Sequence, residues 1–231
     1  MIDLNPRQRL ATKTLNSTRA WLACGVVAGP LYVSVTMVQS LTRQGFDLKN
    51  HRFTLLTTGE LGWIHQLNMI VVGVLTLLLA IGVSRALTSG RGAVWGPRML
   101  GTVGLAYLFG GLFVADPIVG FPPGTTAEMV QKTWQGIIQN VSRGASTLAL
   151  LVTSVIIALW FSSRGSRGWA WFYGAGFPTM FVTLSLVGLA IGFNGGGLAF
   201  LVTPWIWIST LAAHLIGREI RANKQAVRET A

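Results

Sequence analysis

Charged side chains are scarce in this chain, at 11% of its 231 residues. Soluble domains carry about 25%, so the composition excludes an ordinary soluble protein. Acidic residues are the scarcest, with seven against eighteen lysines and arginines and a net charge of +11. The basic residues lie at the ends of apolar runs and form no single patch. This arrangement argues against a nucleic-acid partner and is typical of loop charges that orient a membrane protein.

The sequence also lacks the residues of common catalytic and metal centres. Cys24 is the only cysteine, which excludes an internal disulfide and a cysteine metal cage. There is no Gly-x-Ser-x-Gly nucleophile motif and no phosphate-binding glycine loop. A zinc site needs three or four converging ligands, and His51, His65, Glu60 and Asp116 have no tight ligand spacing. We therefore expect no metal and no cofactor.

Long hydrophobic runs are what the sequence does have, with 51% hydrophobic residues overall. Runs of about 20 apolar residues are long enough to cross a bilayer. We predict an all-α, polytopic transmembrane helical bundle of six spans, at about 21–41, 62–83, 99–115, 133–161, 169–193 and 198–217. Residues 1–20 are predicted to be a basic cytoplasmic arm, and residues 218–231 a basic, disordered cytoplasmic tail.

The distribution of lysine and arginine predicts the orientation of this bundle. The arm, the tail and the connections 84–98 and 162–168 together hold thirteen of them, and the other three connections hold four. Both termini are therefore expected in the cytoplasm, in a protein of the cell membrane. Four of the seven acids then lie outside: Asp47, Glu60, Asp116 and Glu128.

Glycine and proline predict how the runs pack and end. Gly25 and Gly29 form a small-xxx-small spacing that allows close helix contact. Oligomerisation is allowed by such residues but not required. Connection 84–98 is predicted to be a loop because of its glycines and Pro97. Further predictions are an end of the third span at Asp116-Pro117, a kink at Pro178 and a tight turn at 194–197.

Polar residues inside the spans indicate a candidate site. Gln135, Gln139 and Arg143 recur every four residues and so share one helix face. Asn68 shares a face with His65 in the second span. Ionisable groups at membrane depth usually face the bundle interior and have a partner. We therefore expect one polar cluster in the outer half of the bundle, made of Glu60, His65, Asn68, Asp116, Gln135, Gln139 and Arg143.

Three functions remain open for this cluster. The first is binding or handling of a lipid or small molecule, with Asn68, Gln135, Gln139 and Arg143 as binding residues. The second is an intramembrane enzyme in which Glu60 or Asp116 acts as acid or base, with His65 as a further candidate catalytic residue. The third is a small transporter, which the absence of a clear internal repeat disfavours. A purely structural role, with Arg143 paired to Asp116 or Glu60, is equally compatible with the sequence, and His51 is expected to be solvated.

Two segments resemble the domain-of-unknown-function 998 family (DUF998). The first is the Phe-Asp-Leu to Gly-x-Leu-Gly-Trp-Ile stretch, residues 46–64. The second and more specific is Gly-x-Phe-x-x-Asp-Pro-x-x-Gly-Phe-Pro-Pro-Gly, residues 111–124. The resemblance extends from about residue 21 to residue 217. It implies a bacterial or archaeal six-span membrane protein, related by fold to the Frag1-like group, and no established activity.

The chain departs from that family pattern at one place. Family members often carry histidines after the Pro-Pro-Gly loop, and the matching positions here are Gln135 and Gln139. If those histidines bind metal or move protons in relatives, the resemblance implies that this chain lacks that capacity.

Overall fold

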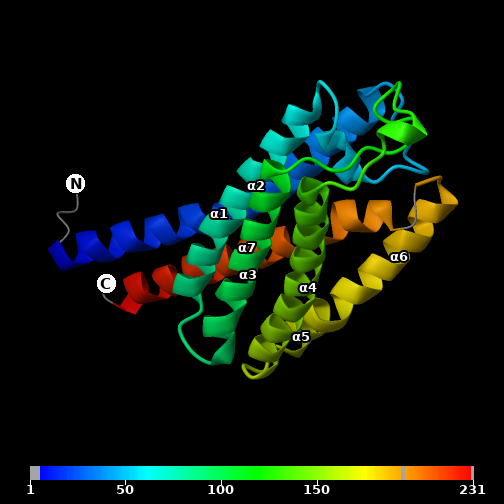
Figure 1. Cartoon of the computed structure of the whole chain (residues 1–231). Coiled ribbons are helices and arrows are strands. Elements are labelled where there is room, and N and C mark those ends of the chain that lie inside the picture. Colours follow the sequence, from blue (N-terminus) through cyan, green and yellow to red (C-terminus); the bar gives the residue numbers. More distant parts are fainter. Residues whose placement is uncertain (1–5, 194–195, 230–231) are drawn as a thin grey trace.

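The computed structural model describes residues 6–193 and 196–229, and Figure 1 shows that most of them are helical. The long helices are α1 (Pro6–Thr42), α2 (Gly62–Ala86), α3 (Arg91–Leu112), α4 (Trp134–Ser162), α6 (Phe177–Ala190) and α7 (Gly197–Glu229). The short elements are α5 (Arg167–Trp171), the 3-10 turns η1 (Phe53–Thr57) and η2 (Ala127–Met129), and the π-helical turn η3 (Phe172–Gly176). No β-strand occurs in the described residues, which confirms the all-α class.

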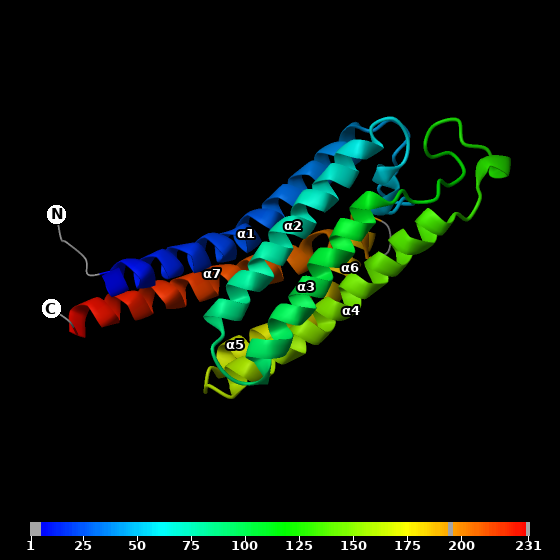
Figure 2. The same ribbon diagram turned by 60° about the vertical axis from the view of Figure 1, so that its left-hand side comes forward.

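Five helical stretches are long and apolar enough to cross a membrane: 17–42, 62–86, 134–162, 167–190 and 197–225. These agree with five of the six predicted spans and make the chain a multi-pass membrane protein by length and composition. α3 runs beside α2 and α4 in both views (Figures 1 and 2). It is not among the five, and its first eight residues include the charged Arg91 and Arg98.

One end of the bundle is formed by connections 43–61 and 113–133, and we call it the loop end. The Thr57 hydroxyl accepts a hydrogen bond from the Ala115 amide at 3.0 Å, which joins these two connections. The rings of Phe53 and Phe193 lie 6.4 Å apart, so the end of α6 reaches the same place. Figure 2 shows the two connections side by side above the helices.

The opposite end, which carries the first turns of α1 and the last turns of α7, is called the terminal end. There Arg19 of α1 donates a hydrogen bond to the Glu219 carbonyl of α7 at 3.2 Å. Arg164, after α4, donates to the Ser89 carbonyl between α2 and α3 at 3.0 Å. The connections that were predicted to share one side therefore do meet at one end of the bundle.

Glycines allow the helices of the bundle to approach closely. A Cβ atom added at Gly73 of α2 would lie 2.8 Å from the Gly104 carbonyl oxygen of α3, so the two backbones touch there. On α1, a Cβ at Gly25 would lie 2.7 Å from Leu79, and one at Gly29 would lie 2.9 Å from Trp205. The predicted small-xxx-small contact therefore joins α1 to α2 and α7.

The second connection was wrongly predicted to be a loop throughout. α3 begins at Arg91, so Gly92, Gly96 and Pro97 are helical. The reason is packing against α4: a Cβ at Gly92 would lie 2.7 Å from Trp160, and one at Gly96 would lie 3.2 Å from Ile157. These glycines provide close approach rather than a turn. α3 also ends at Leu112, earlier than the predicted end at Asp116-Pro117.

Both terminal segments continue the helices next to them. α1 begins at Pro6, so most of the predicted arm is helical. α7 extends to Glu229, which contradicts a disordered tail. Residues 218–229 contain good helix formers such as alanine, arginine, lysine and glutamine. Near Pro178, the π-helical turn η3 lies directly before α6. Turns of this kind are a common cause of helix kinks, and the kink at Pro178 stays a prediction. Part of the predicted 194–197 turn lies outside the described residues.

Candidate functional site

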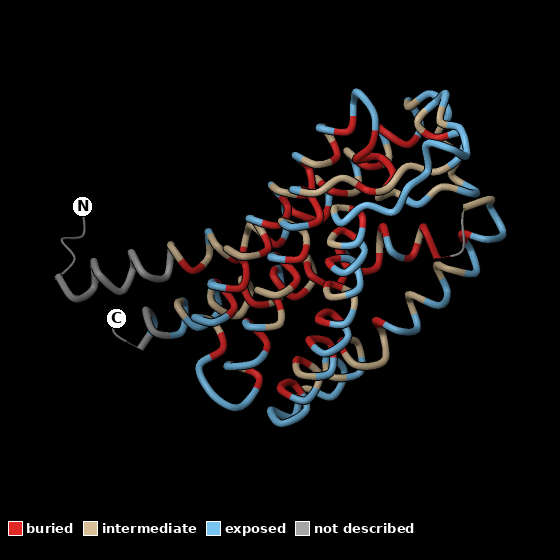
Figure 3. Tube along the Cα trace, in the orientation of Figure 1, coloured by how far each residue is buried: buried red, intermediate tan, exposed pale blue. Residues whose placement is uncertain are grey.

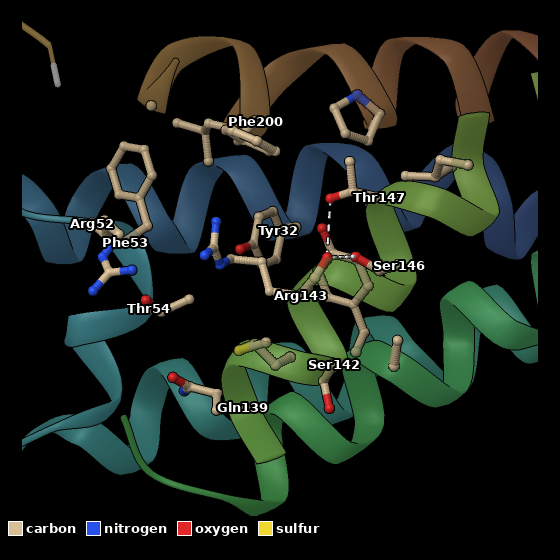
Figure 4. Close-up of a pocket in the computed structure, with 17 residues that line it drawn as sticks. Tyr32, Arg52, Phe53, Thr54, Gln139, Ser142, Arg143, Ser146, Thr147 and Phe200 are labelled. Carbon is tan, nitrogen blue, oxygen red and sulfur yellow. Dashed lines mark hydrogen bonds between the residues drawn. The ribbon is translucent and has the colours of Figure 1, made fainter. Parts of the chain in front are cut away.

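A pocket of about 140 Å³ lies in the half of the bundle nearest the loop end, between α4 and the first turns of α7. Its apolar lining comes from four helices and from η1 and includes Phe53, Met69, Ala106, Leu150, Phe200, Leu201 and Pro204. Figure 4 shows α7 along one side of this pocket, with Phe200 facing the polar side chains of α4. An empty volume of this size holds a group about as large as a benzene ring.

Two arginines line the same pocket, Arg52 from the connection before η1 and Arg143 from α4. Figure 4 shows both guanidinium groups toward the side where that connection lies. Arg143 is nine residues beyond the start of α4, about 13 Å along the helix. Arg52 and Arg143 therefore bring two positive charges to one pocket. No acidic side chain lines the pocket within the described residues.

Tyr32 of α1 forms another part of the lining and is almost fully buried. Its ring contacts Tyr107 of α3 and Trp205 of α7, with centroid distances of 5.4 and 5.1 Å. The ring of His65 of α2 lies 5.9 Å from that of Tyr32, between centroids. The predicted site residue His65 is thus next to a lining residue but does not itself line the pocket.

The side chain of Gln139 fixes the position of connection 43–61, which contains Arg52. Its amide nitrogen donates to the Thr57 hydroxyl at 3.1 Å and lies within 3.5 Å of the carbonyl oxygens of Gly110 and Phe113. Thr57 in turn donates to the Thr54 carbonyl at 2.8 Å. The Gln139 side chain was predicted to bind a ligand. It lines the pocket, but its donors are committed to fixing η1 against α3 and α4.

Asp116 is placed at the start of α4 and lies outside the pocket. Its carboxylate oxygen accepts hydrogen bonds from the Thr133 amide at 3.0 Å and the Thr133 hydroxyl at 2.7 Å. That hydroxyl also caps α4 by accepting from the Gly136 amide at 3.1 Å. A negative charge at a helix N-terminus is stabilising. A Cβ at Gly136 would collide with the carboxylate, so glycine is required there.

The other predicted site residues also lie outside the pocket. His65 and Asn68 are buried between α1 and α2, where the Asn68 amide donates to the Tyr32 carbonyl at 3.3 Å. Glu60 is exposed at the loop end, and Gln135 is half-buried in the first turn of α4. No ion pair of Arg143 with Asp116 or Glu60 is found in the described part of the chain. The structure thus assembles only Gln139 and Arg143 of the predicted cluster in the pocket.

Arg43 and His51 join the two loop-end connections. Arg43 donates hydrogen bonds to the carbonyls of Leu56 and Thr58, and its guanidinium lies 5.6 Å from the centre of the Phe121 ring. Burial lowers the pKa of Arg43. The His51 ring lies 5.2 Å from that of Phe121 and its Nδ1 accepts from the Asp47 amide at 3.0 Å. His51 is therefore packed in an aromatic cluster, which corrects the expectation of a solvated residue.

Sequence reasoning did not find Arg52, Tyr32 or the residues of α7 as parts of the site. Arg52 lies in a connection, where an arginine is ordinary, and nothing in its neighbours marks it. Tyr32 and Phe200 follow the apolar pattern of any membrane helix. The one available signal was the polar face of α4, which does lead to Arg143.

Among the described residues, no three histidine, cysteine, aspartate or glutamate side chains lie close enough together to hold a metal ion. The fold and the site together define an all-helical multi-pass membrane protein with a small pocket that carries two arginines. A family model, described as a protein of unknown function (DUF998), matches residues 26–214. The chain belongs to this family, which confirms the resemblance seen in its two loop-end segments. No curated protein and no solved structure matches the chain.

Proposed function

We propose that this protein binds the anionic head of an amphiphilic molecule, such as a lipid or a fatty-acid-like compound, in the pocket between α4 and α7. The main observation behind this proposal is that Arg52 and Arg143 line the same pocket. Among the described residues, no acidic side chain lines it. A charged group at membrane depth normally has a partner. Two neighbouring guanidinium groups repel each other, and an anion between them would remove that cost and gain charge-assisted hydrogen bonds.

The size of the pocket supports a ligand that enters with only one end. Pockets that enclose whole drug-sized ligands measure about 300–1,000 Å³, whereas this one measures about 140 Å³. Arg52, Arg143 and Phe200 are exposed at its edge. A head group and its first carbons would occupy the pocket, and the remaining chain would lie along apolar helix surfaces in the surrounding lipid.

The proposal includes six crossings with both termini in the cytoplasm of a prokaryotic cell. Three observations support it: α3 connects the terminal end with the loop end, the chain termini share one end, and most lysines and arginines belong to that end. The pocket would then lie in the outer half of the bilayer. Catalysis by Glu60 or Asp116 receives no support, because neither residue lines the pocket.

Native mass spectrometry in a neutral detergent tests the binding. Hexadecyl phosphate and hexadecyl maltoside share a chain and differ in head-group charge. We expect retention of the phosphate only, with a loss of at least tenfold in Arg143→Gln and Arg52→Gln. Arg167→Gln is the matched control, since Arg167 is exposed and lies outside the pocket. Equal retention of both amphiphiles, or equal retention of the phosphate by all variants, would contradict the proposal.

A further inference from the structure

A second and larger cavity, of about 600 Å³, lies at the terminal end of the bundle. It is bounded by the end of α4, the turn that follows it, α5 and the second half of α7. This volume is within the range of sites that enclose small ligands. Neither the family match nor the function proposed above accounts for it.

The cavity is strongly basic. Arg164, Arg218 and Arg221 line it together with a single acid, Glu219. Three positive charges against one negative charge leave a net charge of +2 when His214 is neutral. A cavity that concentrates charge of one sign attracts ions of the opposite sign.

Two of these arginines lie against the ring of Trp160. The Arg164 guanidinium lies 3.8 Å from the centre of the Trp160 ring and that of Arg218 lies 4.8 Å from it. The indole nitrogen of Trp160 donates to the Ser89 carbonyl at 3.1 Å, which fixes the ring. The guanidinium groups of Arg164 and Arg218 are therefore held against a fixed ring before any ligand binds, which lowers the entropic cost of binding.

The two arginines differ in the donors they have available. Arg164 Nη2 donates to the Ser89 carbonyl at 3.0 Å and to the Ser89 hydroxyl at 2.7 Å, so this terminal nitrogen is already engaged. The Nη1 atom of Arg218 is buried and has no hydrogen-bond partner within the described part of the chain. A buried donor without a partner costs free energy, and a small shift of the Arg218 side chain toward the cavity would let an oxygen-bearing ligand recover it.

We propose that this cavity binds a phosphate group, with Arg218 as the main hydrogen-bond donor and with Arg164 and Arg221 supplying charge. Phosphate suits the site because it presents several acceptor oxygens and because guanidinium groups match its geometry. The phosphate belongs either to an anionic phospholipid of the adjacent leaflet or to a soluble phosphate compound. Basic pockets between helices at the cytoplasmic side are known to take phospholipid head groups.

The test uses the full-length protein in a neutral detergent and native mass spectrometry. Three probes are compared: dioleoylphosphatidylglycerol, dioleoylphosphatidylcholine and glycerol 3-phosphate. The comparison is made in Arg143→Gln, whose first pocket cannot contribute: we expect this variant to retain phosphatidylglycerol at least fivefold more than phosphatidylcholine, and the double variant Arg143→Gln/Arg218→Gln to lose that preference. Retention of glycerol 3-phosphate without the lipid preference, also lost in Arg218→Gln, would support the proposal with a soluble ligand.

Variants at other arginines make the result specific. Arg167→Gln removes a nearby charge outside the cavity and should retain the ligand. Arg143→Gln changes only the other pocket and should also retain it. Arg221→Gln, at an exposed position, provides a second cavity variant if Arg218→Gln folds poorly by size-exclusion chromatography. The proposal is overturned if wild type retains no phosphate probe selectively, or if Arg143→Gln loses the ligand while the folded cavity variants keep it.

Discussion

At the residue scale, Asp116 shows how a residue with a catalytic appearance can hold a helix end. It is an acid between a proline and an apolar run, and it was a reasonable acid or base candidate from sequence. In the structure its carboxylate accepts both hydrogen bonds offered by Thr133, and Thr133 caps α4. The same helix carries Arg143 into the pocket. Asp116 therefore supports the pocket indirectly, by fixing where α4 begins.

We expect Asp116→Asn to lower stability while leaving ligand retention at the pocket intact. The substitution removes a charge that favours the N-terminus of α4 and weakens the hydrogen bonds to Thr133, a loss of about 1–2 kcal/mol. For a chain of this size, that corresponds to a fall in melting temperature of about 2–8 °C. Thermal unfolding followed by tryptophan fluorescence measures it. Glu60→Gln, at an exposed acid of the same end, is the control and should change nothing. An unchanged melting temperature with lost hexadecyl phosphate binding would give Asp116 a direct functional role.

At the scale of elements, the contact between α2 and α3 decides how the bundle is built. Gly73 and Gly104 face each other so closely that a Cβ atom on either would lie under 3 Å from the other's carbonyl oxygen. In a membrane, helix association depends on such close packing because lipid is as apolar as the side chains. The first turns of α3 carry the charged residues described above, which makes this helix less apolar than its neighbours. Its close packing against α2 holds it in the bundle.

Gly73→Ala should destabilise the folded protein, because the added methyl group would lie 2.8 Å from backbone atoms of α3 and the helices must separate. Such overpacking costs about 1–3 kcal/mol. Gly101→Ala in α3 is the matched control, since a Cβ there meets nothing within 4 Å. Alanine is the better helix former, so this control should keep or raise the melting temperature. Equal melting temperatures for both variants would contradict the close packing of α2 against α3 at Gly73.

At the scale of the whole molecule, positively charged cavities lie toward both ends of one bundle. The pocket near the loop end holds Arg52 and Arg143, and the cavity at the terminal end holds Arg164, Arg218 and Arg221. Figure 3 shows buried residues concentrated along the inward-facing sides of the helices between these ends, whereas much of α6 is exposed. Exposed apolar residues such as Val182 and Leu186 of α6 suit contact with lipid tails.

The proposed orientation is tested by labelling single cysteines in intact cells. Cys24→Ser removes the native thiol, and Thr126→Cys and Thr88→Cys then place one at an exposed loop position of each end. These positions avoid the positive-φ glycines, such as Gly124 with φ 89°. A membrane-impermeant maleimide should label Thr126→Cys in whole cells and Thr88→Cys only after lysis. The reverse pattern would invert the protein and place the pocket in the inner half of the membrane.

The sequence alone determined the helical membrane class and most helix positions. Helices 62–86 and 134–162 begin and end within about three residues of their predictions, because apolar length and flanking charge are local properties that a bilayer selects. The family followed from the glycine, proline and acidic residues of the two loop-end segments. Where glycine serves packing instead of turning, as at Gly92 and Gly96, the local pattern was misleading, since the partner helix is far away in the sequence.

Tertiary structure alone decided which polar residues form a site. Sequence spacing placed Gln139 and Arg143 on one helix face, but it could not show that Asp116 holds the residue that caps the same helix, or that Arg52 and Arg143 line one pocket. Those outcomes depend on how connection 43–61 folds over the bundle. Hydrogen bonds of Arg43, Thr57 and Gln139 fix that arrangement. Such contacts join residues that are up to 82 positions apart in the chain. Helix periodicity relates only near neighbours, and so a pocket built from six segments appears only when they are packed.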